Sequence, residues 1–203
     1  SEIRKVQDDG VQVALVIGGG NIFRGVALQK AGLDRVAGDQ MGMLATVMNG
    51  LAMRDELIRQ GGKCVLMSAY GIPSISAQYS AVAGRKALED GNVVIVAGGT
   101  GSPFFTTDTT AVLRAIELKC DEVMKGTKVD GVYTADPVKD PSAVRYTSLS
   151  FNEVLAKELQ VMDLTAFVLA RDHHMPIRVF SMNNEGALLR AATGKDEGTL
   201  VSD

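Results

Sequence analysis

Glycine-rich segments that directly follow apolar runs hold most of the residues in this chain that could do chemistry. The first, VIGGGNIFRG at residues 16–25, is not the dinucleotide fingerprint, because Phe23 stands at a required glycine, and not a P-loop, because Val26 and Ala27 replace the lysine and the hydroxyl residue. Its consecutive glycines still leave backbone N–H groups open to an anion, and Arg24 adds a forked cationic donor. The segment predicts a phosphate site, with a tight turn and a solvated Arg24 as the alternative.

The second segment, residues 96–118, runs from an apolar strand pattern through glycines and threonines into a helix pattern. Asp108 lies among the threonines and has two interpretations. It either caps the helix or organises cationic groups around a transferring phosphoryl group, while the glycines and threonines donate to a substrate. The neighbouring Phe104 and Phe105 either anchor the core or form a wall of a nucleobase pocket.

The third segment, residues 124–141, is a strand pattern followed by charged, turn-rich sequence. Its lysines and threonine can reach phosphates, and its tyrosine and aspartate suit a nucleoside; a solvated loop is the alternative. These candidates are Lys125, Thr127, Lys128, Tyr133 and Asp136.

Composition excludes several other classes of protein. The chain has 203 residues, of which 46% are hydrophobic, and a net charge of −3, so it can bury a core and has no basic stretch with which to bind nucleic acid. No apolar run approaches the ~20 residues of a membrane helix, and the first residues lack the apolar core of a signal peptide, so a cytoplasmic location is expected. Neither the two cysteines nor the adjacent His173 and His174 have a metal-binding spacing, so no protein metal site is predicted.

The elements that must position these residues alternate along the chain. Continuous β-branched runs predict buried strands at 11–17, 63–67, 92–97, 122–125, 177–182 and 198–202. Helix patterns lie between them at 40–59, 80–89, 108–119, 151–158 and 163–173. This order predicts one α/β domain over residues 1–203, a three-layer sandwich around a mostly parallel central sheet.

The helix predicted at 40–59 is apolar on more than one side. One stripe is suited to dock on the sheet: Met41, Leu44, Met48, Leu51 and Ile58. Met43, Met53 and Leu57 fall off that stripe, so a second apolar face is expected to pack against the same helix of another subunit, with coverage by loops of the same chain as the alternative.

The chain resembles the bacterial uridylate kinases (UMP kinases), which have the amino-acid-kinase fold. The resemblance spans the chain and is carried by GGGNIFRG (18–25), GDQMGMLATVMNGLAMRD (38–55), GTGSPFFTTD (99–108), KGTKVDGVYTADP (125–137) and VMDLTAFVLARDHHMPIRVF (161–180). PFFTTD together with TKVDGVYTADP distinguishes this family from the acetylglutamate, aspartate and carbamate kinases of the same fold.

The resemblance implies a role for each matching residue. Gly19 and Asp39 contact UMP, Asp39 through the ribose, and residues 100–107 wrap UMP: Thr100, Gly101, Ser102, Pro103, Phe104, Phe105, Thr106 and Thr107. The ATP contacts are Gly20, Arg24, Thr127, Tyr133 and Asp136. The implied catalytic residues are Arg24 at the phosphates, Asp108 as a carboxylate that orients phosphate-binding groups, and Asp163 near the active site.

The resemblance also implies phosphoryl transfer from ATP to UMP with Mg²⁺ carried by ATP, a homohexamer built from dimers, and UTP and GTP as effectors. The UMP-binding part is expected at roughly 1–115 and the ATP-binding part at 116–203. Members of the family begin with a further strand and helix bearing a Lys-Leu-Ser-Gly-like phosphate motif, and this sequence starts after it, so we expect it to be incomplete at its N-terminus. A same-fold kinase with an amino-acid or carbamate acceptor, and a uridine-nucleotide-sensing module without turnover, are the alternatives.

Overall fold

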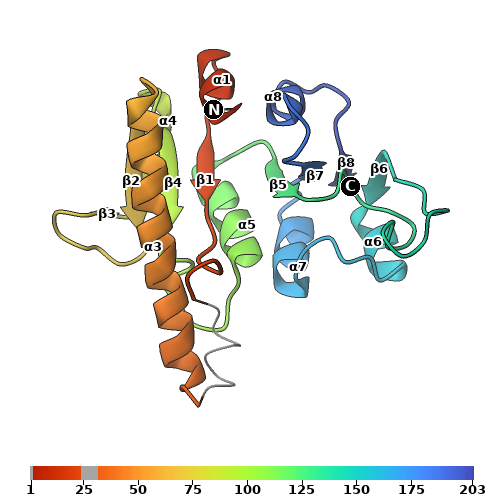
Figure 1. Ribbon diagram of the computed structural model, residues 1–203, viewed down its shortest axis with the longest axis horizontal. Coiled ribbons are helices and arrows are strands. Elements are labelled where there is room, and N and C mark those ends of the chain that lie inside the picture. The colour runs from red at the N-terminus through yellow and green to blue at the C-terminus, as the bar shows by residue number, and fades with distance from the viewer. Residues whose placement is uncertain (1, 24–31) are drawn as a thin grey trace.

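The computed structural model describes residues 2–23 and 32–203 of the chain. Its strands form two four-stranded sheets (Figure 1). In the first, all pairs are parallel, and the order is β1 (Ala14–Val16), β4 (Val93–Ala97), β2 (Cys64–Ser68), β3 (Ala77–Gln78). In the second, only β7 and β8 are antiparallel, and the order is β5 (Val123–Thr127), β7 (Ile177–Ser181), β8 (Thr199–Ser202), β6 (Ser148–Ser150).

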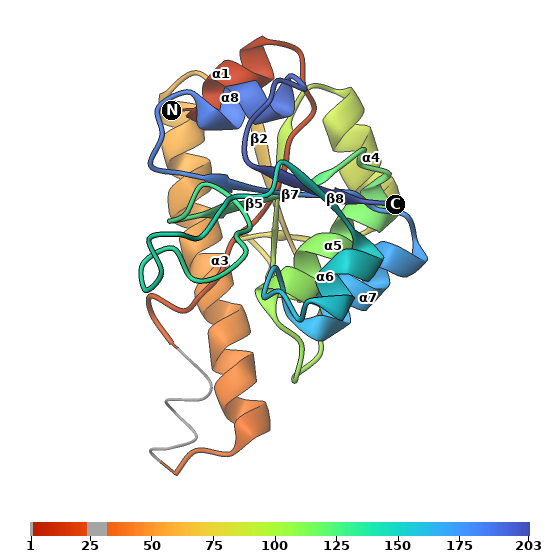
Figure 2. The same ribbon diagram turned by 90° about the vertical axis from the view of Figure 1, so that its right-hand side faces the viewer.

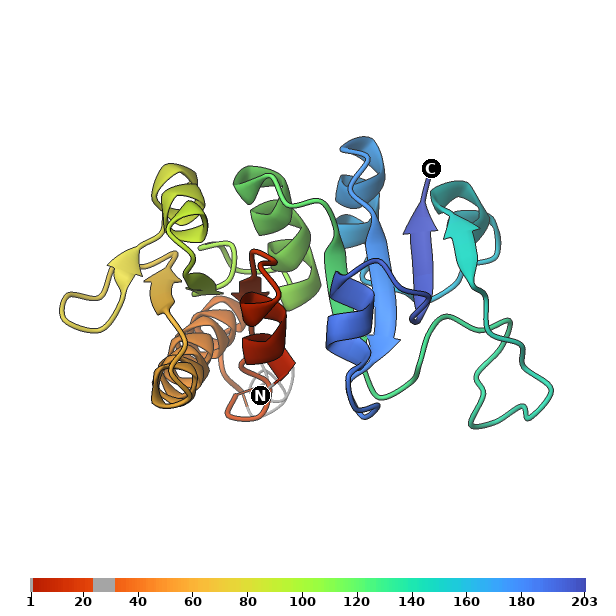
Figure 3. The same cartoon turned by 90° about the horizontal axis from the view of Figure 1, so that it is seen from above.

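Helices cover both faces of the sheets, as Figure 3 shows from above. On one side of the first sheet lies α3 (Arg35–Arg59), and on the other side lie α4 (Ala81–Glu89) and α5 (Thr107–Leu118). The second sheet carries α6 (Phe151–Ala156) and α7 (Leu164–Asp172) on one side and α8 (Ala187–Ala192) on the other. The predicted α/β class with a mostly parallel arrangement is confirmed; the strands that the structure describes are hydrogen-bonded as two sheets instead of one.

Strand β4 explains why the apolar runs are continuous. Val93, Ile95 and Ala97 pack with α3, whereas Val94 and Val96 pack on the α4 and α5 side. Successive strand residues point to opposite faces, so a strand covered on both sides is apolar at every position.

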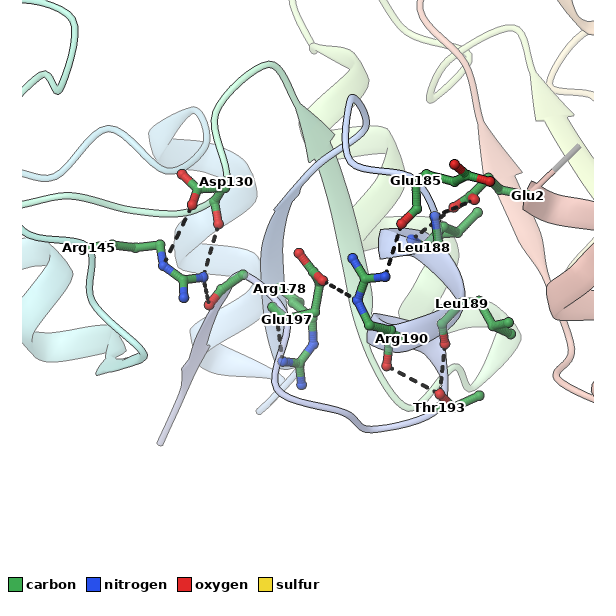
Figure 4. A network of polar contacts seen from close by, with 12 residues as sticks. Glu2, Asp130, Arg145, Arg178, Glu185, Leu188, Leu189, Arg190, Thr193 and Glu197 are labelled. Carbon is green, nitrogen blue, oxygen red and sulfur yellow. Dashed lines mark hydrogen bonds and ion pairs between the residues drawn. The ribbon is translucent and has the colours of Figure 1, made fainter.

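Contacts between the two halves of the molecule involve α5 with α7, and α1 (Glu2–Asp8) with α8. Figure 2 shows α1 and α8 side by side. The Glu2 carboxylate accepts hydrogen bonds from the backbone amides of Gly186 (2.6 Å) and Leu188 (3.2 Å) (Figure 4). Neither helix was predicted, because α1 buries only Val6 and each is short, so they depend on this tertiary contact more than on their own patterns.

Helix boundaries follow their capping residues. Asp34 accepts a hydrogen bond from the Ala37 amide, so α3 begins at Arg35 and not at residue 40 as predicted. Ser150 and Glu153 form the capping box that starts α6. The short strands β3 and β6 were also missed, because two or three paired residues leave no periodic pattern.

Helix α3 presents to the sheet a different face from the one predicted. Met43 and Leu57, for which the pattern predicted the outer side, are buried in the core. Three residues of the stripe predicted to dock on the sheet are instead about half exposed: Leu44 (48%), Met48 (56%) and Ile58 (53%). A helix that is apolar on two sides has a similar pattern from either side, so periodicity could not choose the buried face.

Candidate active site

A cavity of about 270 Å³ opens at the carboxyl ends of β1 and β4. Ligands of parallel α/β sheets bind at this edge, where loops leave the strands. The first glycine-rich loop, the N-terminal half of α3, the loop after β4 and the N-terminus of α5 surround it. Its lining residues are Val16, Ile17, Gly19, Gly20, Phe23, Arg35, Asp39, Gly42, Met43, Thr46, Val96, Gly99, Ser102, Phe105, Thr106, Thr107 and Thr110.

The first glycine-rich loop lies directly against α3. A Cβ atom at Gly19 would be 2.5 Å from the Gly42 carbonyl oxygen and 2.9 Å from Ala45 Cβ, so a side chain there would push the loop away from the helix. Asn49 Nδ2 donates to the Gly18 carbonyl at 2.7 Å and fixes the same loop. Sequence reasoning missed Asn49, whose only signal is an amide within the mostly apolar stretch from Met41 to Met53 of this helix. Arg24, predicted at the phosphates, lies outside the described residues.

Asp39 connects α3 to the loop after β4. Arg35 Nε donates to both Asp39 carboxylate oxygens, at 2.9 and 2.8 Å, and the Phe104 amide donates to Asp39 Oδ2 at 2.8 Å. The side chain of Asp39 is only 15% exposed, yet it lines the cavity. The carboxylate is therefore held in place at the cavity wall, where its remaining lone pairs can accept hydrogen bonds from the hydroxyl groups of a ligand.

The loop after β4 begins with a glycine turn, in which the Gly101 amide donates to the Gly98 carbonyl. Gly98, Gly99 and Gly101 all have positive φ, which glycine adopts without steric cost. Phe104 and Phe105 are 65% and 52% exposed, so they do not anchor the core. Phe105 lines the cavity, and the Arg35 guanidinium lies 5.4 Å from the Phe104 ring centroid.

The N-terminus of α5 faces the cavity. Thr106 is its N-cap and accepts a hydrogen bond from the Thr109 amide, and Thr106, Thr107 and Thr110 line the wall. Unpaired N–H groups and the helix dipole make such a terminus favourable for an anion. Of the two sequence interpretations of Asp108, the capping role is wrong, since Thr106 is the cap.

Asp108 instead pairs with a cation. Lys125 Nζ, from β5, lies 2.7 Å from Asp108 Oδ2 and also donates to the Val161 carbonyl at 2.9 Å. Each side chain is 28% exposed, so the pair is partly open to solvent. The pair holds the Lys125 ammonium beside the N-terminus of α5, and the role of Asp108 in orienting phosphate-binding groups stays a prediction.

Asp163 joins the N-termini of two helices. Its carboxylate caps α7 by accepting a hydrogen bond from the Ala166 amide (3.0 Å). It also accepts hydrogen bonds from the hydroxyl groups of Thr106, the N-cap of α5, and of Thr109 in α5. Burial works to raise the pKa of Asp163, but hydrogen bonds from the threonine hydroxyls and the Ala166 amide outweigh it, and the pKa lies below its ordinary value. Asp163 is thus an anchor of the wall rather than part of the cavity lining.

The third segment stands apart from this cavity. Thr127, Tyr133 and Asp136 do not line it. Each makes local hydrogen bonds: Thr127 Oγ1 with the Val129 backbone, Tyr133 with Asp130 at 2.6 Å, and Asp136 with the Val138 amide at 3.0 Å. Within the described residues, six of the predicted UMP residues line the cavity: Gly19, Asp39, Ser102, Phe105, Thr106 and Thr107. Thr100, Gly101, Pro103 and Phe104 belong to the same loop but do not line it, whereas Gly20, predicted for ATP, does.

The chemistry of the cavity suits a phosphorylated ligand. It combines backbone N–H groups, a helix N-terminus and the guanidinium of Arg35 with hydroxyl groups and one carboxylate. The described residues include no group of three or more His, Cys, Asp or Glu side chains that could hold a metal ion.

The comparisons with known proteins agree with this geometry. Residues 1–181 match the amino acid kinase family. Uridylate kinase of Vibrio cholerae is 59% identical over 202 residues, covering 100% of this chain and 83% of that protein, and uridylate kinase of Aeromonas salmonicida is 60% identical over 200 residues, covering 98% and 82%. The crystal structure of UMP kinase from Bacillus anthracis superposes with a TM-score of 0.96 at 39% identity, covering 100% of this chain and 84% of that one. The chain therefore belongs to the amino acid kinase family, and within it to the uridylate kinases.

Proposed function

We propose that this chain transfers the γ-phosphoryl group of ATP to UMP, giving UDP and ADP in pyrimidine nucleotide biosynthesis. The observation that carries the proposal is the single cavity in which Asp39, the loop after β4 and the N-terminus of α5 meet. Its lining suits a nucleoside monophosphate, because it offers a carboxylate for ribose hydroxyls, an aromatic wall for the base and N–H donors for a phosphate.

The reaction requires no general base. The second pKa of a phosphate monoester is about 6, so the acceptor oxygen of UMP is already anionic at neutral pH. The obstacle is repulsion between two polyanions, and the site must supply positive potential. In this proposal the N-terminus of α5, the glycine loop with Gly19 and Gly20, and Arg24 supply it, and Asp108 holds the Lys125 ammonium nearby.

The remaining roles divide between the two halves of the chain, roughly 1–115 for UMP and 116–203 for ATP. Asp39 binds the ribose and residues 100–107 enclose the acceptor. Thr127, Tyr133 and Asp136 hold ATP. Asp163 acts by holding the hydroxyl groups of Thr106 and Thr109. These contacts favour a supporting role next to the site of phosphoryl transfer over direct contact with a nucleotide.

Mg²⁺ is proposed as the metal that accompanies ATP. In kinases, magnesium is usually bound by the phosphates of the substrate and by one or two carboxylates of the protein. The described residues offer single aspartates and no cluster of three or more possible ligands, which is compatible with this mode of binding. The bound ion would neutralise phosphate charge during transfer.

Self-association is proposed through the outer face of α3, as a homohexamer built from dimers, with UTP and GTP as effectors. The exposed apolar residues Leu44, Met48 and Ile58 support a contact between copies of this helix. A cytoplasmic location remains part of the proposal. No helix in the described part of the chain has the length and apolar character needed to cross a membrane.

The test is an acceptor screen combined with binding. ADP release is measured with UMP, CMP, carbamate, aspartate and acetylglutamate, and UMP binding is measured by calorimetry. Turnover with UMP alone supports the proposal. Turnover with an amino acid or carbamate would establish a different kinase of this fold, and UMP binding without turnover would favour a nucleotide-sensing module.

A further inference from the structure

A buried arginine lies behind the loop that follows β4. Arg114, in α5, is 6% exposed and does not line the cavity. Its Nη2 donates to the Gly99 carbonyl at 3.1 Å, and its Nη1 lies 2.7 Å from Glu117 Oε2. The guanidinium carbon is 4.2 Å from the centroid of the Tyr79 ring, whose hydroxyl donates to the same Glu117 oxygen at 2.8 Å.

This buried charge has no evident advantage for the fold alone. Buried ion pairs can often be replaced by apolar residues without loss of stability, because desolvation offsets their attraction. The Arg114 Nε atom is moreover buried with no hydrogen-bond partner among the described residues, which adds a desolvation cost. The contacts of Arg114 with Glu117 and Tyr79 stay between α5 and its neighbour, whereas the charged hydrogen bond to Gly99 reaches the loop after β4.

Gly99 belongs to the turn that starts the loop between β4 and α5, residues 98–106, which is called the substrate loop below. Its neighbours in that turn are held from other elements, the Gly98 amide by Thr46 Oγ1 at 2.7 Å and the Gly101 carbonyl by the Tyr70 hydroxyl at 3.1 Å. Arg114 supplies the third attachment. In a trans peptide the carbonyl and the N–H point in opposite directions, so a Gly99 carbonyl directed at Arg114 sends the Thr100 N–H away from it.

We propose that Arg114 is a positioning residue for the UMP site, which fixes the Gly99–Thr100 peptide from behind and thereby holds residues 100–107 in the conformation that receives the acceptor. The inference rests on the proposed function. Its energetic basis is that a pre-ordered loop does not lose conformational freedom when the ligand binds. Removing Arg114 therefore weakens UMP binding and leaves ATP binding intact.

The experiment compares Arg114→Met, which removes the charge at similar length, with Arg114→Lys, which keeps the charge and loses the fork. Dissociation constants and KM are measured separately for UMP and ATP. We expect Arg114→Met to raise the UMP values by at least ~10-fold, the scale of losing a hydrogen bond to a charged group, and the ATP values by less than about twofold. Arg114→Lys should recover part of the UMP affinity, because an ammonium can still donate to Gly99.

Arg85→Met is the matched control. Arg85 Nη1 donates to the Glu117 carbonyl at 2.6 Å, so this variant also removes an arginine–carbonyl bond at α5, away from the substrate loop. It should leave both nucleotides unaffected. If Arg114→Met does not fold, Glu117→Gln is tested in its place, because it weakens the ion pair that holds the Arg114 guanidinium. The Glu117 side chain is 32% exposed, so this change disturbs the core less.

Two results would overturn the positioning role: unchanged UMP affinity, or equal losses for UMP and ATP. A wild-type chain that binds no UMP would instead overturn the proposed function, and the positioning role with it.

Discussion

The Asp39 carboxylate accepts a hydrogen bond from the Phe104 amide at 2.8 Å. The first turns of α3 are therefore hydrogen-bonded to a loop 65 residues further along the chain. Arg35 Nε donates to both oxygens of the same carboxylate. Asp39 thus has two tasks, to shape the substrate loop and to present oxygen atoms to the cavity.

Replacement of Asp39 by alanine should raise the KM for UMP and leave the KM for ATP unchanged. The expected loss is roughly 1.5–3 kcal/mol, or about 10- to 150-fold, because hydrogen bonds to a charged group disappear. Steady-state kinetics with each nucleotide varied in turn measures it. Asp55→Ala, on the exposed part of the same helix, is the control. A raised ATP KM beside normal UMP kinetics would show that the assignment is wrong.

Replacement of Asp108 by asparagine should lower kcat about 10- to 100-fold while both KM values change little. Asparagine preserves the shape but no longer attracts Lys125, so the ammonium is free to move from its place beside the α5 N-terminus. Single-turnover kinetics isolates the chemical step. A kcat within twofold of wild type would mean that the pair only connects α5 to β5.

Arg24→Ala should lower kcat by at least ~100-fold, comparable with the loss of one preorganised donor. This expectation comes from the sequence, since Arg24 lies outside the described residues. Rapid-quench measurement of phosphoryl transfer tests it. Near-normal turnover would show that the side chain is solvated.

Replacement of Asp163 by asparagine should destabilise the protein in a pH-dependent way. The folded-state pKa of Asp163 lies below the unfolded value, so its stabilising contribution is complete above the unfolded pKa and is lost as the pH falls through the folded one. Urea denaturation of both proteins at pH 7 and at about pH 3 should therefore give a larger difference in unfolding free energy at pH 7. An equal difference in unfolding free energy at both pH values would show that the charge of Asp163 does not contribute to stability.

The double substitution Leu44→Glu and Met48→Glu should dissociate the proposed oligomer, because unpaired negative charges in an apolar contact are costly to bury. Light scattering during size exclusion measures the mass. Val82→Glu, on α4, is the control, since Val82 is apolar and 71% exposed. An unchanged mass for the double variant would place the interface elsewhere.

Much of the architecture followed from local patterns. The β-branched runs predicted the main strands because a strand covered on both faces is apolar at every position, as β4 is. The capping box at Ser150 and Glu153 marked the start of α6 because its hydrogen bonds are local in sequence. The glycine and threonine motif predicted a ligand-binding loop because its residues are contiguous in sequence, and five of them line the cavity: Gly99, Ser102, Phe105, Thr106 and Thr107.

Tertiary structure alone decided the features that depend on distant residues. The buried face of α3 was chosen by the sheet it packs against, because its pattern is apolar on two sides. Pairing of Asp108 with Lys125, and the attachment of Gly99 to Arg114, join segments whose separation in sequence carries no signal. Local chemistry determines which residues can bind a phosphate, whereas the packing of strands and helices determines which of them share one cavity.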